Sequence, residues 1–266
     1  LTSASTYYWW VRSDCGAETS AWASGGSFTT LCNATNVPYA ENFESAIVPA
    51  LPNCTASQNV GTGNNWVTIN NPGSGFTSNT LKYGYNSSDA NAWFYTAGIN
   101  LVAGKSYLVS YDYGNRSTYA EKMKVAVGTS AVNTAMTTEL ANYPNIVGAA
   151  LQSANVTFTP SVSGVYYFGF NAYSIGGQWD LYLDNIKVEA ACPTGVWVGT
   201  TSDWNTASNW ADNMVPQACT NVTVNVAAPM IISSDVTVAK ITLGASAVVT
   251  VGSTGVLNVG TISVAT

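Results

Sequence analysis

The sequence contains no histidine among its 266 residues. Histidine is the commonest general base and a frequent metal ligand, so its absence removes Ser-His-Asp and Cys-His catalysis and every histidine-containing metal site. The five cysteines show no Cys-x-x-Cys spacing, which argues against zinc and thioredoxin-like sites. Two local hints of a carboxylate pair exist, Asp180 near Asp184 and Glu121 beside Lys122. We expect Glu121 on a solvated edge and predict a protein that is not an enzyme.

Charged residues are scarce as well, at 8% of the chain, against about 25% in ordinary soluble domains. The net charge is −6 and the eight basic residues are scattered. A nucleic-acid partner requires clustered cations, so this class is excluded. The sequence also lacks a long uninterrupted apolar run, so we expect no membrane span in this chain. It shows no signal peptide, and we expect any targeting segment to lie outside it.

The chain is instead rich in Thr, Ser, Asn and Gly, together with Val, Tyr and Trp. This mixture favours strands and turns over helices, because β-branched and aromatic side chains fit a pleated surface. Cysteines in a low-charge chain of this kind fit an extracellular, disulfide-forming environment. We therefore predict an all-β, extracellular protein.

Residues 33–191 are expected to form the main domain. Its strand-like runs are separated by Gly, Asn, Asp or Pro at spacings typical of an antiparallel sandwich. The runs are NWVTI, TLKYGY, AWFYTAGINL, SYLVSYDYG, KMKVAVG, NVTFTP, GVYYFGFNAY and LYLDNIKVE. Eight strands over this length predict two stacked sheets with a jelly-roll topology. Residues 134–143 are the only expected short helix or helical turn.

The last of these strands changes its pattern at Asp184-Asn185. Leu181 and Leu183 alternate with polar neighbours, and the apolar positions then resume at Ile186, one residue out of phase. An extra residue in one strand produces such a slip, so we expect a β-bulge here.

The order of motifs in residues 37–190 has a family resemblance. PYAENFES, AWFYTAGINLVAGKSYLVSYDY, EKMKVAVG, FTPSVSGVYYFGFNAYS and LYLDNIKVE together resemble the cleaved-adhesin, or choice-of-anchor J, family. These are jelly-roll modules, related in shape to MAM and carbohydrate-binding domains. The resemblance implies a large surface protein of Bacteroidota, exported by type IX secretion, with a role in gliding motility or attachment. One departure is that residues 51–53 lead directly into Cys54, where many relatives have a Trp.

The resemblance also implies a structural calcium ion between the first and last strands. Glu44 and Asp184 match positions where such modules place acidic ligands. Calcium takes six to eight oxygen ligands, so Asp89 or Asn91 and backbone carbonyls would have to contribute. The alternative is that Asp184 and Asn185 only satisfy backbone donors at the bulge.

Residues 1–32 are predicted to form two strands around a loop. Their pattern is Tyr8-x-x-Val11-Arg12, then Ser20-x-Trp22, then residues 27–30. This pattern resembles the last two strands of a fibronectin type III domain. Two strands cannot bury a core by themselves, so we expect them to pair with preceding sequence. Trp9 and Trp10 could bind a ligand, but we expect them to be buried strand aromatics.

The remaining residues divide into two segments. Residues 192–220 contain Trp197, Trp204 and Trp210 between Asx-rich turns, a pattern similar to a connector in the same class of surface proteins. Residues 221–266 contain short alternating strands whose centres are only a few residues apart. A parallel β-solenoid of stacked coils fits this spacing better than hairpins do.

Cysteine positions suggest two disulfides. Cys192 and Cys219 flank the connector, and closing their loop would contribute about 3 kcal/mol. Cys32 and Cys54 bracket the first strand of the jelly roll and could pair across it. Cys15 would then be free or bonded to a cysteine outside this sequence, and a Cys15–Cys32 bond is the competing choice.

Two functions remain open. The first is a non-catalytic segment of a large secreted surface adhesin or filament, serving as spacer and attachment surface. Its partners would be extracellular or cell-surface polysaccharide or protein, or neighbouring copies in a filament. The second is a carbohydrate-binding module accessory to a distant catalytic domain. Its candidate ligand-binding residues are Trp66, Trp93, Tyr173, Gln178 and Trp179. Coplanar exposed rings in one groove would favour sugar binding, whereas buried rings would place these residues in the core.

Overall fold

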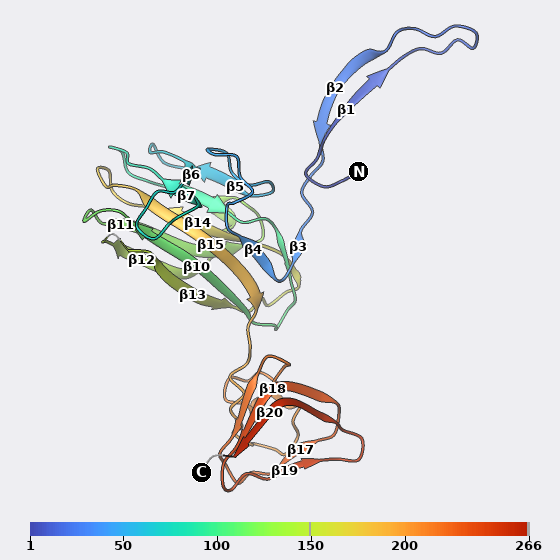
Figure 1. Cartoon of the computed structure of the whole chain (residues 1–266), viewed down its shortest axis with the longest axis vertical. Coiled ribbons are helices and arrows are strands. Elements are labelled where there is room, and N and C mark those ends of the chain that lie inside the picture. The colour runs from blue at the N-terminus through green and yellow to red at the C-terminus, as the bar shows by residue number, and fades with distance from the viewer. Residues whose placement is uncertain (149, 265–266) are drawn as a thin grey trace. The chain divides into compact units, whose positions relative to one another are not determined.

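The computed structural model describes residues 1–148 and 150–264. Within these residues the fold is nearly all β, with only two short 3-10 segments, η1 (Asn133–Ala135) and η2 (Ala207–Asn209). None of the described residues forms a helix with the length and apolarity that crossing a bilayer requires. The chain divides into two compact units, Leu1–Ala190 and Ala191–Thr266. The predicted all-β class is confirmed (Figure 1).

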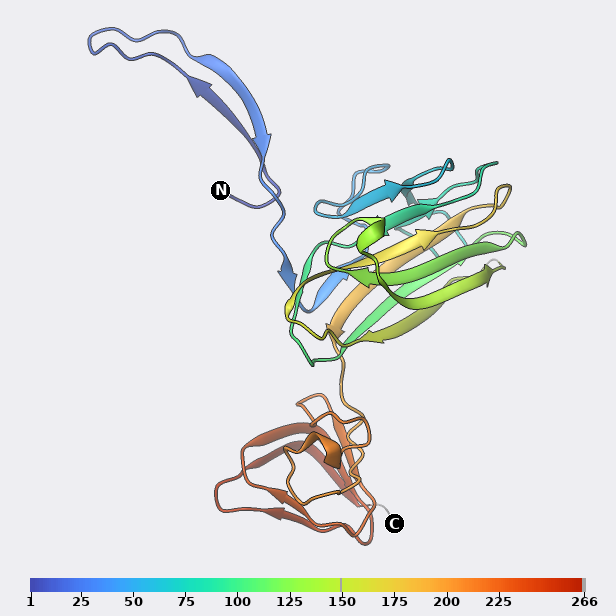
Figure 2. The ribbon, with the colours of Figure 1, turned by 180° about the vertical axis from the view of Figure 1, so that it is seen from behind.

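The first unit contains two sheets that form a sandwich (Figure 2). In one sheet the strand order is β13-β10-β15-β7-β6, and β4 pairs with the free part of β15. Its strands are β4 (Tyr39–Glu41), β6 (Trp66–Asn70), β7 (Asn79–Tyr83), β10 (Tyr107–Asn115), β13 (Gln152–Phe158) and β15 (Leu181–Ala190). The β4–β15 pairing brings the beginning and the end of the sandwich together, as expected for a jelly roll.

The other sheet has the order β12-β11-β14-β8-β5, with β9 on β14 and β3 on β9. Its strands are β3 (Thr35–Asn36), β5 (Ala56–Asn59), β8 (Ala92–Tyr95), β9 (Ile99–Leu101), β11 (Glu121–Gly128), β12 (Thr138–Ile146) and β14 (Gly164–Ala172). All its pairings are antiparallel except the short β3–β9 contact.

The core of the sandwich is built from the alternating residues of facing strands. On β10, Tyr107, Val109 and Tyr111 are buried, while the residues between them are half-buried on the opposite face. Phe94 and Phe170 contribute from the other sheet. Burial of these large side chains stabilises the sandwich by roughly 1.5–3 kcal/mol for each one removed from water.

The β-bulge predicted at Asp184-Asn185 is confirmed. Across the β10–β15 pair, Ser110 lies opposite Lys187 but Asp112 lies opposite Asp184, so β15 has one extra residue. Asn185 takes a φ of +50°, in the left-handed region that asparagine tolerates better than most residues. The extra residue shifts the alternation of side chains along β15 by one position. As a result, both Leu183 and the apolar residues after the bulge face the core.

The helix expected over residues 134–143 is wrong for most of its length. Only η1 is helical, and residues 138–146 form strand β12 on the edge of the seven-stranded sheet. Leu140, Ala141 and Tyr143 pack against the sandwich core, and this tertiary packing decides the structure over local helix propensity.

Residues 1–32 form a hairpin of β1 (Thr6–Val11) and β2 (Ala23–Thr29). The two strands pair with each other and with no other strand of the described chain. Trp9 and Trp10 are 48% and 54% exposed, so their expected burial is wrong. No second sheet covers them within the described residues, and the fibronectin type III assignment stays a prediction.

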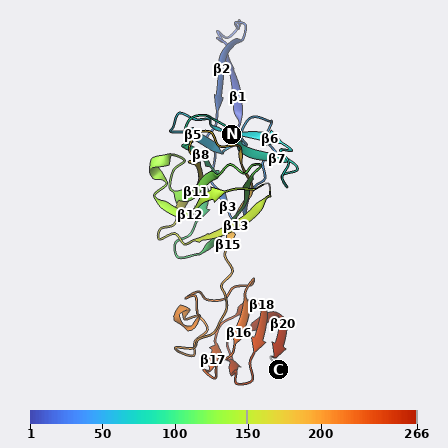
Figure 3. The same ribbon diagram turned by 90° about the vertical axis from the view of Figure 1, so that its left-hand side faces the viewer.

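The second unit is built from parallel strands. Its strands are β16 (Asn221–Val224), β17 (Met230–Ile232), β18 (Val236–Leu243), β19 (Val249–Val251) and β20 (Leu257–Val264). β16, β18 and β20 lie side by side in one parallel sheet (Figure 3). β17 pairs in parallel with β19. Such pairing is the pattern expected of stacked coils. Trp197, Trp204 and Trp210 are fully buried against this sheet.

Candidate functional site

The structure contains both predicted disulfides. Cys32 is bonded to Cys54 and Cys192 to Cys219, while Cys15 is free and exposed. The two pairings are confirmed, and the competing Cys15–Cys32 bond is wrong.

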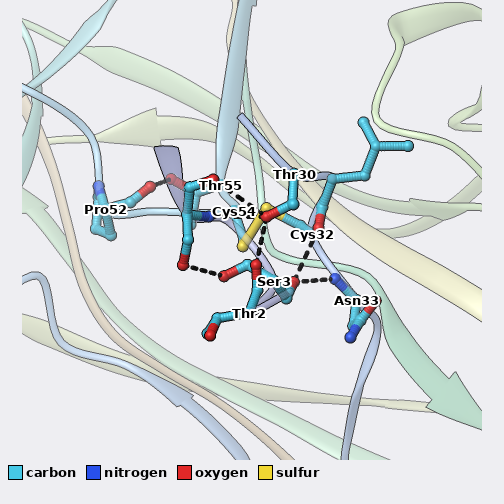
Figure 4. The surroundings of a disulfide bond; sticks show 10 residues. Thr2, Ser3, Thr30, Cys32, Asn33, Pro52, Cys54 and Thr55 are labelled. Carbon is cyan, nitrogen blue, oxygen red and sulfur yellow. Dashed lines mark hydrogen bonds between the residues drawn. A yellow bond between two sulfur atoms is a disulfide. The ribbon is translucent and has the colours of Figure 1, made fainter. Parts of the chain in front are cut away.

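The Cys32–Cys54 bond joins the segment after β2 to the loop before β5 (Figure 4). Hydrogen bonds surround it: the hydroxyl of Ser3 accepts the backbone N–H of Asn33 and donates to the carbonyl of Leu31. The hairpin is therefore covalently attached to the sandwich, although β1 and β2 make no strand pairing with it.

The predicted calcium ligand Asp184 is almost fully buried, at 4% exposure. One carboxylate oxygen accepts the backbone N–H of Asn185 at 2.7 Å, and the other accepts the hydroxyl of Thr80 at 3.3 Å. Burial raises the pKa of this carboxyl to about 6, and the negative charges of Asp112 and Glu44 add to the shift. Asp184 therefore accepts one backbone N–H at the bulge and one hydroxyl from β7.

Only part of the predicted calcium set comes together. The negative charge of Glu44 contributes to the raised pKa of Asp184. The carboxylate of Glu44 accepts the backbone N–H of Asn79 at the start of β7. Asp89 instead accepts the N–H of Gly176 in a loop beyond the end of β14. Asn91 lies near Asp89 in the chain and lines a groove described below.

No group of three or more acidic, cysteine or histidine side chains suited to a metal lies within the described residues. The four residues therefore do not form one oxygen cage, which calcium requires. A calcium ion held by Glu44, Asp184 and backbone oxygens stays a prediction.

Glu121 is buried at 1% exposure, so its expected place on a solvated edge is wrong. It begins β11 on the core side, in phase with Met123, and one of its oxygens accepts the hydroxyl of Ser174. The other oxygen has no hydrogen-bond partner. Burial raises the pKa of Glu121 to about 7, with a further contribution from the charge of Asp180. Glu121 lines neither of the surface features described below, so a raised pKa here does not indicate a catalytic cleft.

The five predicted ligand-binding residues are in three different places. Trp66 belongs to the core: it is 2% exposed, and its indole N–H donates to the carbonyl of Ala92. Its assignment to a ligand site is wrong, because the side chain is enclosed between the sheets. The other four residues divide between two surfaces on the sandwich.

Trp93 and Tyr173 line a groove of about 370 Å³ on the outer face of the seven-stranded sheet. We call this feature the sheet groove. It is lined chiefly by Asn91, Trp93, Lys124, Glu139, Asn171 and Tyr173. Trp93 is 9% exposed and stacks on the ring of Tyr95, so it forms part of the floor. Tyr173 is half-buried and forms one wall.

The walls of the sheet groove carry charge and a polar atom without a partner. The ammonium of Lys124 pairs with Glu139 at 3.0 Å, and the ammonium groups of Lys122 and Lys124 lie 6.0 and 5.4 Å from the centre of the Tyr173 ring. The side-chain carbonyl of Asn171 is buried and has no hydrogen-bond partner.

Trp179 and Gln178 lie on a second feature, which we call the loop-end surface. Trp179 is 46% exposed and contacts Tyr85, which is 53% exposed. The ring centres are 6.0 Å apart with planes at 54°, so the two exposed rings are not the coplanar pair named above as favouring sugar binding. Tyr85 also lines a polar pocket of about 470 Å³, formed with Asn64, Asn65, Val67, Lys82, Gly84 and Asp180. Gln178 is half-buried beside Trp179.

Hydrogen bonds hold the loop-end surface in place. The backbone N–H of Tyr85 donates to Asp180, and the side-chain amide of Asn64 donates to the carbonyl of Tyr85. Asp180 also accepts the hydroxyl of Tyr182 and pairs with Lys82 at 3.7 Å. The two loops that carry the exposed rings are therefore tied together by Asp180.

Tyr85 was not among the residues predicted from the sequence to bind a ligand. It continues the alternation of Leu81 and Tyr83, which are both buried, so its parity predicts a core position. β7 ends at Tyr83, however, and Tyr85 is free to face solvent. The polar partners Asn64 and Asp180 come from separate loops and carry no local signal.

No family model matches the chain, and no curated protein matches it. Among solved structures, the K1 cleaved adhesin domain of Lys-gingipain from Porphyromonas gingivalis W83 is similar, with 16% identity and a TM-score of 0.48 over 58% of this chain and 99% of that chain. The K3 cleaved adhesin domain of the same protein is 13% identical, with a TM-score of 0.45 over 57% of this chain and 96% of that chain.

A carbohydrate-binding module, TmCBM61, solved in complex with β-1,4-galactotriose, is also similar. It is 11% identical, with a TM-score of 0.39 over 51% of this chain and 88% of that chain. The first two structures are of the family that the motifs in residues 37–190 resemble. The choice-of-anchor J name, type IX secretion and gliding motility stay predictions.

Proposed function

We propose that this chain is a non-catalytic attachment segment of an extracellular protein, and that its sandwich binds glycans at the loop-end surface. The exposed ring pair Tyr85–Trp179 is the observation that carries this proposal. Large apolar rings held in the open on ordered loops are typical of binding surfaces.

The chemistry of the loop-end surface suits a neutral sugar. The face of a pyranose is apolar and packs on an aromatic ring, while its hydroxyls need donors and acceptors close by. Asn65, Lys82 and Asp180 provide such groups in the pocket that Tyr85 lines. Because Asp180 already fixes both loops, little conformational entropy is lost when a ligand binds.

Two further observations support the non-catalytic and extracellular parts of the proposal. The chain has no histidine, and neither surface feature places two carboxylates in a cleft. The two disulfides are of the kind that persists in oxidising compartments. A chain of β units, each with one internal disulfide, would serve as a spacer in a longer adhesin or filament, with surface polysaccharide as its partner.

The proposal is tested by screening the chain against an array of neutral and acidic glycans beside the variants Trp179→Ala and Tyr85→Ala. Retention of a neutral glycan by the unaltered chain, with loss in both variants, supports it. Tyr119→Ala is a suitable control, because Tyr119 is a 55% exposed ring outside both surface features. Equal retention of the glycan by all four proteins would contradict glycan binding at the loop-end surface.

A further inference from the structure

One lysine without a carboxylate partner lies beside the sheet groove, next to the ring of Tyr173, within a chain of net charge −6. Lys122 and Lys124 project from the outer face of β11, whereas Met123 and Val125 project into the core. Glu139 is the one carboxylate that lines the groove, and it is paired with Lys124. Among the described residues, Lys122 makes no ion pair. One ammonium group therefore remains available to an anion beside the ring of Tyr173.

The groove also lacks one hydrogen-bond donor. Asn171 is 7% exposed, and its side-chain oxygen has no partner, in a position that lines the groove. A buried acceptor without a donor destabilises the fold, and native proteins keep few of them. A ligand hydroxyl that donates to Asn171 would remove this destabilisation.

Apart from Asn91, the rest of the groove lining is apolar or aromatic. The ring of Tyr173 is held by its hydroxyl, which donates to Asn142, and by its backbone N–H, which donates to the carbonyl of Lys122. Trp93 provides the floor. A ligand for this groove therefore combines an apolar face, a hydroxyl donor and a negative charge, and its size is limited by a volume of about 370 Å³.

We propose that the sheet groove is a second binding site, which takes a carboxylate-bearing sugar, that is, a uronic acid unit of an acidic polysaccharide. Lys122 binds the carboxylate, Asn171 accepts a sugar hydroxyl, and the ring of Tyr173 packs against the sugar. This site shares no residue with the loop-end surface, so one sandwich would contact two different positions on a polysaccharide. Two linked contacts raise the overall avidity above that of either one.

The test measures binding of tetragalacturonate and tetraguluronate by calorimetry, each beside its methyl ester, which keeps the hydroxyls and removes the charge. The acid forms should bind at least tenfold more tightly than the esters at 25 mM salt, with a smaller ratio at 300 mM because salt screens the charge. Lys122→Gln should lower affinity for the acid forms fivefold to tenfold and leave ester binding unchanged. Lys105→Gln, an exposed lysine in a turn, is the matched control.

Asn171→Ala gives a second measurement, because it removes the hydroxyl acceptor without removing charge. It should weaken acid and ester forms alike, while an unchanged melting temperature shows that the sheet is intact. Equal affinity for acid and ester, or no binding of either uronate by the unaltered chain, overturns the second site. Loss of uronate binding in Trp179→Ala but not in Lys122→Gln also overturns it and leaves the proposed function standing. Loss in Lys122→Gln alone supports the second site whatever happens at the loop-end surface.

Discussion

The carboxylate of Asp184 accepts the backbone N–H of its own neighbour Asn185 at 2.7 Å, at the point where β15 contains an extra residue. The side chain of Asp184 thus binds the backbone of Asn185, the residue at the bulge. It does so while 4% exposed, so an ionised carboxylate here is held away from water. The cost of that arrangement is visible in its pKa, which burial raises to about 6.

The raised pKa predicts how stability varies with pH. Since the folded-state pKa of Asp184 is about 6 and its ordinary value is 3.8, the folded chain retains a proton that the unfolded chain releases between these values. This group therefore favours folding most below about pH 4, and that contribution is lost as pH rises through 6. Asp184→Asn should flatten this part of the profile and raise stability at pH 7.5 by on the order of 1 kcal/mol.

Urea unfolding between pH 4 and pH 8 in the presence of EGTA measures this effect. Glu189→Gln is the matched control, because Glu189 lies exposed on the same strand. If the free energy of unfolding of Asp184→Asn changes with pH in the same way as that of the unaltered chain, the raised pKa of Asp184 is contradicted.

The raised pKa of Glu121 predicts a second loss of stability, at a higher pH than that of Asp184. The folded-state pKa of Glu121 is about 7 against an ordinary 4.5, so its contribution to folding is lost as pH rises through 7. Glu121→Gln retains an oxygen that can accept the hydroxyl of Ser174 and removes the ionisable group. The variant should be more stable than the unaltered chain at pH 8 and no more stable at pH 4. Thermal unfolding at those two pH values is sufficient, and a gain at pH 4 alone would contradict the prediction.

Calcium binding is tested separately by thermal unfolding with calcium and with EGTA. If Glu44 and Asp184 hold the ion, calcium raises the melting temperature by a few degrees, because it binds only the folded state. The rise should disappear in Asp184→Ala and shrink in Glu44→Gln. Asp89→Asn should leave it unchanged, because Asp89 bonds to Gly176 away from the pair. The absence of any calcium effect on the unaltered chain would remove the ion from the account.

The second unit depends on the Cys192–Cys219 bond, which closes a loop with a sequence separation of 27. Replacing both cysteines by serine should lower the free energy of unfolding of residues 191–266 by about 3 kcal/mol. The transition of the sandwich should remain where it was, since Cys32–Cys54 is intact. Cys15→Ser is the control, because Cys15 is free and exposed. A shift of both transitions together would show that the units do not unfold independently.

Sequence patterns predicted those parts of the fold that depend on alternation along one strand. β10 and β15 were evident because their core-facing apolar residues repeat at every second position, and the bulge was evident because that repeat slipped at Asp184. Edge strand β12 was not evident. Residues 134–143 have local helix propensity, and only their contacts with β11 make residues 138–146 a strand.

The candidate surfaces were harder to predict, because aromatic residues look alike in sequence whether they are buried or exposed. Trp66 and Trp179 both follow polar residues, yet one is enclosed between sheets and the other stands on a loop. Lys122 and Lys124 did carry a signal: alternate lysines on a strand must share one face. Their proximity to Tyr173 depends on the pairing of β11 with β14, which no local pattern contains.

The proposed glycan contact is tested most directly by the affinity of one retained neutral glycan for the unaltered chain, Trp179→Ala and Tyr119→Ala. Calorimetry at neutral pH should give an affinity about tenfold lower for Trp179→Ala, since stacking on an aromatic ring contributes up to about 1.5 kcal/mol and about 1.4 kcal/mol is tenfold in affinity. Tyr119→Ala should bind as the unaltered chain does. An affinity that is the same in all three proteins would contradict glycan binding at Tyr85 and Trp179.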